Sequence, residues 1–510
     1  MKRAPPVLVI GLDLGDGALV ERWAREGALP RLAGLLETGG VRSLATPADT
    51  LHVSAWPSLY TGTHPGEHGV YYTFQPRPGV QGHRRFDSDM YGRPTVWRLL
   101  SEAGVRCTVF DAPYTHPEPG GTRQVFDWGV WAHYLGTAST PPGTLRALRR
   151  HVGPYALGLE AHDIGLAGRD PEEMSARLVA AVPQKAEAAR WLMREHPWDF
   201  FFVVFGETHP AAHYCWPAGA DAVAAGDDRA LRAVYETIDG AIGRLIDAAP
   251  GDATVCVVSG DSVAPNHGAW HLLPEVLRRL GYLAEPSASA PGPGDGAGSV
   301  AGDEASAGSA GGLVRRVRDA LPEAVRKSLA RHMPRRVRDA LARRVDLARI
   351  DWTRTRAFCL PTDLEGYIRV NLAGREPKGI VKGEAYDDVL DELTVALRRL
   401  EDPTSRTAVV RDVVRTRRRF PGERTDALPD LVVLWEPEPT PRDAVRHPDA
   451  GVVQGASPDA RTATHAAPGF LVARGAGAEV WGDVVDVQHV APALLTHFGV
   501  TPPPHLQGER

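Results

Sequence analysis

Residues 6–13, "PVLVIGLD", form a continuous apolar run that ends in glycine and aspartate. Such a run is typical of a strand that is buried on both faces of a parallel sheet. Amphipathic helical stretches precede most of the similar runs, which are "RCTVFDAP" (106–113), "WDFFFVVFGE" (198–207), "ATVCVVSGD" (253–261) and "DLVVLWEP" (430–437). The alternation predicts an α/β fold, with an open, mostly parallel sheet and helices on both faces.

Polar side chains stand at the ends of several of these runs, namely Asp13, Asp111, Glu207 and Asp261. In an open α/β sheet, ligands bind beyond the carboxyl ends of the strands. We therefore expect the functional site at that edge of the sheet.

Composition excludes several classes of partner. The formal net charge is -5, so no strong positive field attracts nucleic acid. No apolar run is long enough for a membrane span, and the run near Met1 is too short for a signal peptide. The four cysteines stand far apart, without the spacing of a disulfide framework or a thiolate zinc site. We expect a cytoplasmic protein that acts on a small molecule.

The 510-residue chain is longer than one compact core usually fills. Residues 286–312 are rich in Gly, Ala, Ser and Pro, so we expect a flexible linker there. An arginine-rich helical insertion follows at 313–349. The predicted organisation is a first part of the core over 1–285, with a cap insertion at about 71–170, and a return to the core over 350–510.

Histidine spacing is the strongest sign of chemistry. "GETHPAAHYCW" follows an apolar run and separates His209 from His213 by one helical turn, a spacing that suits a metal ion. "SGDSVAPNHGAWH" carries Asp261 and then His267. A further histidine, His465, stands before another predicted strand. Because His209 and His213 occur as a pair at the carboxyl end of a predicted strand, we favour metal binding over a packing role for them.

The stretch "TLHVSAWPSLYTG", residues 50–62, carries Thr50, His52 and Ser54 before a predicted helix. Backbone N–H groups at a helix N-terminus favour an anionic phosphoryl group and an attacking nucleophile beside it. Either hydroxyl is equally suited to cap the helix.

Taken in order, these segments resemble the alkaline phosphatase superfamily, in particular its bacterial type I phosphodiesterase/nucleotide pyrophosphatase branch. "VLVIGLDLGD" resembles the opening strand with its metal-binding aspartate, Asp13, and "WPSLYTGTHPGEHGVY" resembles the helix after the nucleophile. "THAAPGFLVARGAG" is similar to the turn with the last metal-binding histidine, His465, and "DVVDVQHVAPALLTHFGV" to the closing helix. The resemblance implies two metal ions, commonly zinc, that flank a phosphorylated Thr or Ser.

The chain departs from the family's pattern in its metal motifs. His209 stands where the Asp-x-x-x-His motif has aspartate, and the Ser-Asp-His motif is replaced by Ser259, Gly260 and Asp261. An ungapped comparison puts His52 in the place of the nucleophile. Three attacking groups remain open: a hydroxyl of Thr50 or Ser54, the imidazole of His52, which is also a candidate ligand, or a water molecule activated at the metal.

The residues present still predict a metal centre. His209, His213 and His465 would give a three-imidazole zinc site with an open fourth position. Asp13 and Asp261, with His52 or His267, would form a second, oxygen-richer site that suits Mn or Mg.

We expect a metal-dependent hydrolase or transferase that acts on a small phosphate ester, such as a phosphorylated metabolite or nucleotide. The alternative is a pseudoenzyme that keeps the fold as a binding module after loss of the usual Asp–His pair. Asp127 and His133, in "VFDWGVWAHY" (125–134), are candidate pocket residues. The sequence does not identify the substrate or the oligomeric state.

Deletion of residues 286–312 should leave the fold intact, because this stretch has little apolar surface to bury. Limited proteolysis of the full chain should cut there first, and the deletion variant should melt at the wild-type temperature. First cuts elsewhere, or an insoluble deletion variant, would contradict this domain division.

Overall fold

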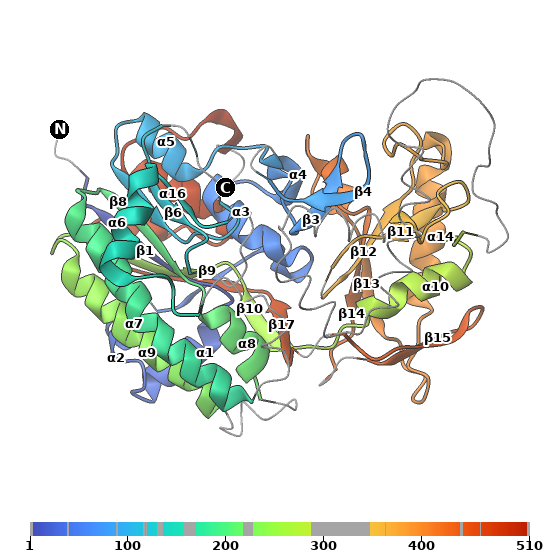
Figure 1. Cartoon of the computed structure of the whole chain (residues 1–510), viewed down its shortest axis with the longest axis horizontal. Coiled ribbons are helices and arrows are strands. Elements are labelled where there is room, and N and C mark those ends of the chain that lie inside the picture. Colours follow the sequence, from blue (N-terminus) through green and yellow to red (C-terminus); the bar gives the residue numbers. More distant parts are fainter. Residues whose placement is uncertain are drawn as a thin grey trace.

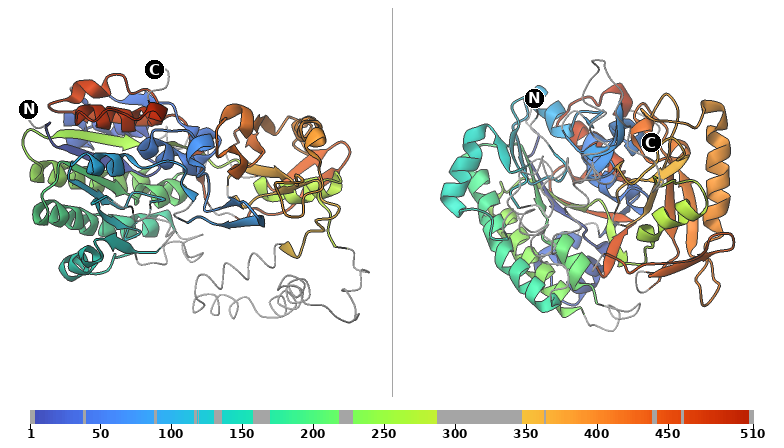
Figure 2. Two further views of the ribbon diagram at one scale, coloured as in Figure 1. Left: turned by 90° about the horizontal axis from the view of Figure 1, so that it is seen from above. Right: turned by 45° about the vertical axis from the view of Figure 1, so that its right-hand side comes forward.

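The computed structural model describes most of the chain, in these segments: 4–37, 40–87, 90–115, 118, 120–129, 136–157, 170–217, 228–286, 347–362, 364–438, 442–458 and 461–506. The expected linker and nearly all of the arginine-rich insertion lie outside the described residues, as does His133. Figures 1 and 2 show a larger lobe built on an eight-stranded sheet and a second lobe built on a four-stranded sheet.

The large sheet confirms the predicted α/β fold. Its strand order is β2-β18-β9-β1-β8-β5-β6-β7, with β9, β1, β8, β5 and β6 parallel to one another. The bounds are β2 (Arg42–Leu44), β18 (Gly469–Arg474), β9 (Thr254–Ser259), β1 (Val7–Leu12), β8 (Phe200–Phe205), β5 (Cys107–Phe110), β6 (Arg123–Phe126) and β7 (Ala138–Thr140). Only β18 and β7 run antiparallel to the neighbours that join them to this block.

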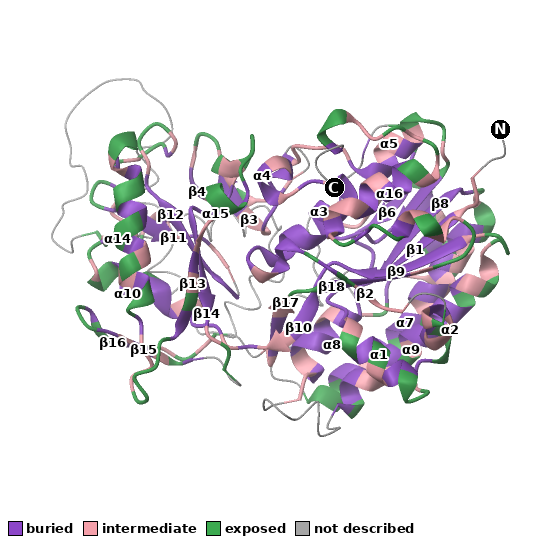
Figure 3. Ribbon diagram, turned by 180° about the vertical axis from the view of Figure 1, so that it is seen from behind, coloured by how far each residue is buried: buried purple, intermediate pink, exposed green. Residues whose placement is uncertain are grey.

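Side chains of β1 alternate between two apolar cores. Leu8, Ile10 and Leu12 pack in a core with the helices of one face, and Val7 and Val9 pack with those of the other. The first face carries α1 (Gly17–Arg25), α2 (Pro30–Leu36), α6 (Pro142–Val152), α7 (Pro171–Glu195) and α9 (Arg229–Ala248). The second face carries α3 (Ala55–Thr61), α5 (Val96–Glu102) and α16 (Val490–His497). Burial on both faces, visible in Figure 3, explains the unbroken apolar runs of the sequence.

The second lobe differs from the sequence-based expectation. It contains an antiparallel sheet in the order β11 (Ala357–Cys359), β12 (Gly366–Val370), β14 (Leu431–Trp435) and β13 (Val410–Arg415). Two helices pack on one face of this sheet, α10 (Leu273–Arg279) and α14 (Tyr386–Arg398). The run at 430–437 therefore forms a strand as predicted, but outside the large sheet. The chain re-enters the large sheet only at β18.

The expected cap at 71–170 is also different. Most of its described strands belong to the large sheet: β5 and β6 extend the parallel block, and β7 adds an antiparallel strand at the edge. The exception is a hairpin of β3 (Phe74–Arg77) and β4 (Val80–Arg85). Between the lobes lies a two-stranded antiparallel ribbon of β10 (Ser262–Pro265) and β17 (Ala463–Ala466). The second lobe has a ribbon of its own, formed by β15 (Ala444–His447) and β16 (Gly451–Gln454). No described helix is long and apolar enough to cross a membrane.

A fully buried lysine ties several elements of the large lobe together. Lys185 Nζ, from α7, lies 3.2 Å from Asp111 Oδ2 and 3.7 Å from Glu207 Oε2. It also donates to the carbonyl oxygens of Gly129 and Val204. Burial raises the pKa of both carboxyl groups, and the lysine opposes this effect. Asp111 and Glu207, two of the four strand-end acids, therefore have a structural partner.

Replacing Lys185 with methionine should lower the free energy of unfolding by about 3–5 kcal/mol, because two buried carboxyl groups lose their cation. Carboxyl groups with raised folded-state pKa values bind protons more tightly in the folded protein, so the loss should be larger at pH 8 than at pH 5. Urea unfolding at both pH values measures it. The exposed Lys382→Met variant is the control, and an equal loss in both variants would contradict the assignment.

Candidate metal centre

The candidate site lies at the carboxyl edge of the large sheet. Asp13 follows β1 and Asp261 follows β9. His209 and His213 lie on the short helix α8 (Thr208–Cys215), which begins just after β8, and His465 lies on β17. Parallel strands end at the same edge, so residues far apart in sequence meet there.

Three histidines converge on one point. The ligand-capable atoms of His209, His213 and His465 lie within 4.8 Å of one another. Within the part of the chain that the structure describes, this is the one group of three or more His, Cys, Asp or Glu side chains with that geometry. The Nε2 atoms of His209 and His213 are 3.1 Å apart. Two nitrogens bound to one tetrahedral zinc ion at ~2.05 Å are about 3.3 Å apart, so this spacing fits a shared cation.

Each of these rings uses Nδ1 for a hydrogen bond to an oxygen atom. His209 Nδ1 is 3.0 Å from Asp13 Oδ2, and His465 Nδ1 is 2.6 Å from Asp261 Oδ2. His213 Nδ1 is 2.8 Å from the carbonyl oxygen of Ala463. A neutral imidazole that donates through Nδ1 keeps a lone pair on Nε2, which is the form that binds metal.

The protonation state agrees with this arrangement. Burial lowers the pKa of His213 well below its ordinary value, and the neighbouring His209 lowers it further. Burial also lowers the pKa of His465 well below its ordinary value, and the neighbouring His52 lowers it further. A neutral His213 ring that donates Nδ1–H to Ala463 keeps a lone pair on Nε2, and the Nε2 atoms of His209 and His465 lie close to it. A divalent cation is the partner that these lone pairs fit.

The two aspartates lie behind the histidines. Asp13 accepts from Trp56 Nε1 through Oδ1 at 2.7 Å while its Oδ2 faces His209. Asp261 accepts from Ser259 Oγ through Oδ1 at 3.2 Å while its Oδ2 faces His465. These contacts differ from the second, oxygen-rich metal site expected from the sequence, because all four carboxylate oxygens already have partners. Carboxylates in this position fix the ring orientation of ligand histidines.

His52 lies next to this cluster. Its ring stacks on that of His465, with centroids 4.6 Å apart and an interplanar angle of 29°. Its Nδ1 is 2.9 Å from Glu365 Oε2, and the same oxygen accepts from the Tyr367 hydroxyl at 3.2 Å. Glu365 comes from the loop before β12 in the second lobe, so each lobe supplies one member of this pair. Sequence analysis missed Glu365, because a single acid before a strand carries no pattern.

The two candidate hydroxyls already have other partners. Thr50 Oγ1 donates to Asp49 Oδ1 at 3.0 Å, and Ser54 Oγ donates to the carbonyl oxygen of Val70 at 2.8 Å. Both side chains are almost fully buried, and Ser54 does not cap helix α3. Of the candidates in the opening stretch, the described contacts bring only His52 to the histidine cluster.

The remaining candidates lie elsewhere. His267 places Nδ1 2.6 Å from the carbonyl oxygen of Pro265 and lines a cavity that His465 also borders. Asp127 accepts from the Gly136 N–H at 2.8 Å, which holds the loop after β6. A role for Asp127 in substrate binding stays a prediction.

The mostly parallel sheet with helices on both faces defines an α/β fold of the alkaline phosphatase type, with the histidine cluster at the carboxyl edge of the sheet. The chain belongs to the type I phosphodiesterase / nucleotide pyrophosphatase family, whose model matches residues 7–457. The family resemblance seen in the sequence is thereby confirmed. The family and the fold make the protein a hydrolase of phosphoric esters, in a family that depends on divalent metals.

Solved structures share the fold over nearly the whole chain. The phosphonoacetate hydrolase from Sinorhizobium meliloti 1021, in complex with phosphonoformate, is 13% identical with a TM-score of 0.51, and the match covers 97% of this chain and 96% of that one. The same enzyme in complex with phosphonoacetate is 14% identical with a TM-score of 0.50, and the match covers 97% of this chain and 96% of that one. An inactive form of murine ectonucleotide pyrophosphatase / phosphodiesterase 5, in complex with AMP, is 12% identical with a TM-score of 0.49. That match covers 98% of this chain and 96% of the murine one. No match was found among curated protein sequences.

Metal binding should depend on the histidines for coordination and on Asp261 for orientation. We expect about one zinc ion per chain, no retained zinc in His213→Ala, and zinc affinity weakened by about 10- to 100-fold in Asp261→Asn. Elemental analysis and competition with a chelating dye measure both quantities, with the exposed Asp252→Asn variant as control. Two bound ions in the wild type, one of them lost in Asp261→Asn, would instead make Asp261 a ligand of a second metal.

Proposed function

We propose that the protein hydrolyses small phosphate esters with one divalent metal ion, zinc, held by His209, His213 and His465. The observation that carries this proposal is the convergence of three Nε2 atoms whose Nδ1 atoms are all engaged by oxygen. When bound there, zinc would polarise a phosphoryl oxygen and lower the pKa of a water ligand to about 7.

In this proposal His52 takes the place of the family's hydroxyl nucleophile and acts as a general base. Nδ1 of His52 donates to Glu365, so Nε2 carries the lone pair that removes a proton from the attacking water. The water oxygen forms the new bond to phosphorus, the bond to the leaving alcohol oxygen breaks, and that oxygen takes up a proton from solvent. Glu365 holds the ring in one orientation and stabilises the imidazolium that forms.

A small, anionic substrate fits the proposed zinc-dependent hydrolysis of phosphate esters. The phosphonoacetate hydrolase of the same fold was solved with phosphonoformate and phosphonoacetate, both small phosphorus compounds. We place the protein in the cytoplasm, because all four of its cysteines are free. The second candidate function, a metal-binding pseudoenzyme, is favoured by the engaged hydroxyls of Thr50 and Ser54.

Activity on bis(4-nitrophenyl) phosphate tests these roles in the zinc-loaded protein. His52→Ala should lower kcat by about 100- to 10,000-fold, because the proton acceptor is lost. Glu365→Gln should lower kcat less, because the ring keeps a hydrogen-bond partner without its charge. Thr50→Val and Ser54→Ala are the matched controls and should stay within a few-fold of wild type.

Stereochemistry distinguishes the mechanisms. Direct attack by water should invert a chiral phosphorothioate diester in a single turnover, and no phosphorylated residue should be trapped. Trapped phosphate on Thr50 or Ser54, or full activity in His52→Ala, would refute the role of His52. Zinc binding with no turnover of any phosphate ester would establish the pseudoenzyme.

A further inference from the structure

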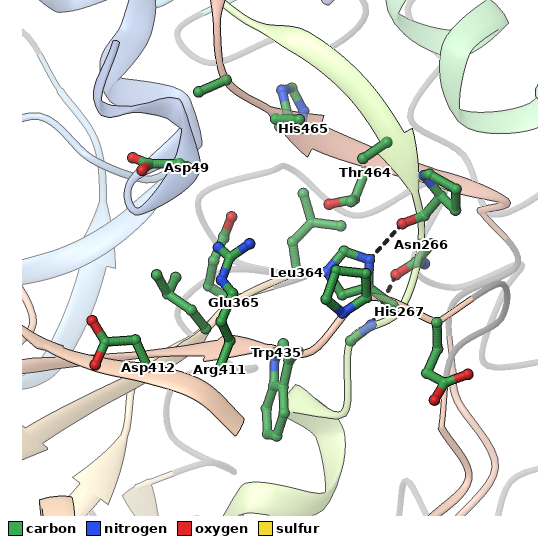
Figure 4. A pocket seen from close by; sticks show the side chains of 18 residues that line it. Asp49, Asn266, His267, Leu364, Glu365, Arg411, Asp412, Trp435, Thr464 and His465 are labelled. Atoms are coloured by element: carbon green, nitrogen blue, oxygen red, sulfur yellow. Dashed lines mark hydrogen bonds between the residues drawn. The ribbon is translucent and has the colours of Figure 1, made fainter. Parts of the chain in front are cut away.

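A large cavity lies beside the histidine cluster, where the two lobes meet. Its volume is about 830 Å³, and His465 and Glu365 form part of its wall. The other walls come from the loop after β10 and from the adjoining ends of β13 and β14. Figure 4 shows side chains from both lobes around this space. A ligand with phosphorus at the cluster has room for its remaining part here.

Arg411 is directed into this cavity by an irregularity in the second sheet. Val410 pairs with Trp435 and Asp412 pairs with Leu434, so β13 has one residue more than β14 at this point. Arg411 is that extra residue, which makes it a β-bulge. Bulges interrupt the strict alternation of a strand and re-aim a side chain, often next to a binding site. Figure 4 shows the Arg411 side chain extending among the residues that line the cavity.

The cavity contains acids, but all of them have partners. The pairs are Asp412 with Arg398, Glu438 with Arg442, Glu365 with His52, and Asp49 with the Thr50 hydroxyl. Arg411 has no hydrogen-bond or ion-pair partner among the described residues. Arg411 is exposed, so its unpaired guanidinium group is open to a ligand, and such groups bind carboxylates and phosphates through paired N–H donors.

A tryptophan ring, Trp435, forms part of the same wall. Trp435 is 4% exposed, and its Nε1 has no hydrogen-bond partner in the described part of the chain. The unpaired N–H has no exposed surface, as is also true of four other described tryptophans, so Trp435 contributes an apolar ring to the cavity wall rather than a donor to a ligand. Trp435 pairs with Val410, the residue before Arg411, so its ring lies next to the bulge.

We propose that this cavity binds a second anionic group of the substrate, a carboxylate or a phosphate, through the guanidinium group of Arg411. The inference rests on the proposed function, because it assigns the reacting phosphorus to the histidine cluster. The substrate is then a phosphate ester that carries another negative charge on the part remote from the reacting bond.

The test compares three 4-nitrophenyl phosphodiesters of the same short alcohol, ending in a methyl ester, a carboxylate or a phosphate. The zinc-loaded wild type should have a kcat/KM roughly 10- to 100-fold higher for at least one anionic diester than for the neutral one. Arg411→Gln should remove most of this preference, with at most a small change for the neutral diester. Arg411→Lys should restore part of it, because the charge remains without the paired donors. The exposed Arg417→Gln, outside the cavity, should behave as wild type.

The outcomes separate this inference from the proposed function. Hydrolysis of the diesters with the same preference in wild type and Arg411→Gln would overturn the subsite and leave the hydrolase intact. No hydrolysis of any diester would overturn the proposed function. The subsite would then be decided by calorimetry with inorganic pyrophosphate and inorganic phosphate: selective weakening of pyrophosphate binding in Arg411→Gln supports it, and equal binding in both proteins refutes it.

Discussion

The carboxylate of Asp13 connects the central strand to both helices that form the site. One oxygen accepts from Trp56 on α3, and the other accepts from His209 on α8. The backbone of Asp13 is fixed as well, because its N–H donates to Phe205 and its carbonyl accepts from Thr208. The side chain at position 11 must be absent for this to work, since a Cβ on Gly11 would lie 2.6 Å from the Trp56 ring. Strand, helices and histidines thus share one buried anchor.

This anchor explains how the metal motifs could change together. A histidine in place of the family's aspartate at position 209 needs a hydrogen-bond acceptor for its Nδ1, and Asp13 provides one. His465 is held in the same way by Asp261, which occupies the place of a family histidine. In the family's pattern an aspartate at position 209 would contact the metal directly. In this chain the carboxylates of Asp13 and Asp261 instead contact the histidines that we propose as ligands. The one-ion site that we propose is richer in nitrogen than the two-metal site implied by the resemblance, and nitrogen ligands favour zinc over Mg or Mn.

The apolar runs of the sequence predicted four strands of the large sheet, β1, β5, β8 and β9, because strands buried on both faces carry such unbroken runs. The run at 430–437 has the same pattern, but it cannot indicate which sheet the strand joins, and β14 is buried in the second lobe. His209 and His213 were recognisable because one helical turn separates them. Glu365 was not, since its contact with His52 spans 313 positions and depends on how the lobes pack. The role of Asp13 and Asp261 also depends on which nitrogen each faces, which spacing alone does not determine.

In the mechanism that we propose, the contact between His52 and Glu365 makes the boundary between the lobes part of the chemistry. The imidazole is supplied by one lobe and its carboxylate partner by the other, and the cavity beside them has walls from both. A small shift of one lobe against the other would therefore change the basicity of the ring and the shape of the cavity at the same time. Substrate size and proton transfer would then be coupled through a single rigid-body movement, without any rearrangement of the metal ligands, all of which belong to the larger lobe or to the ribbon that joins it.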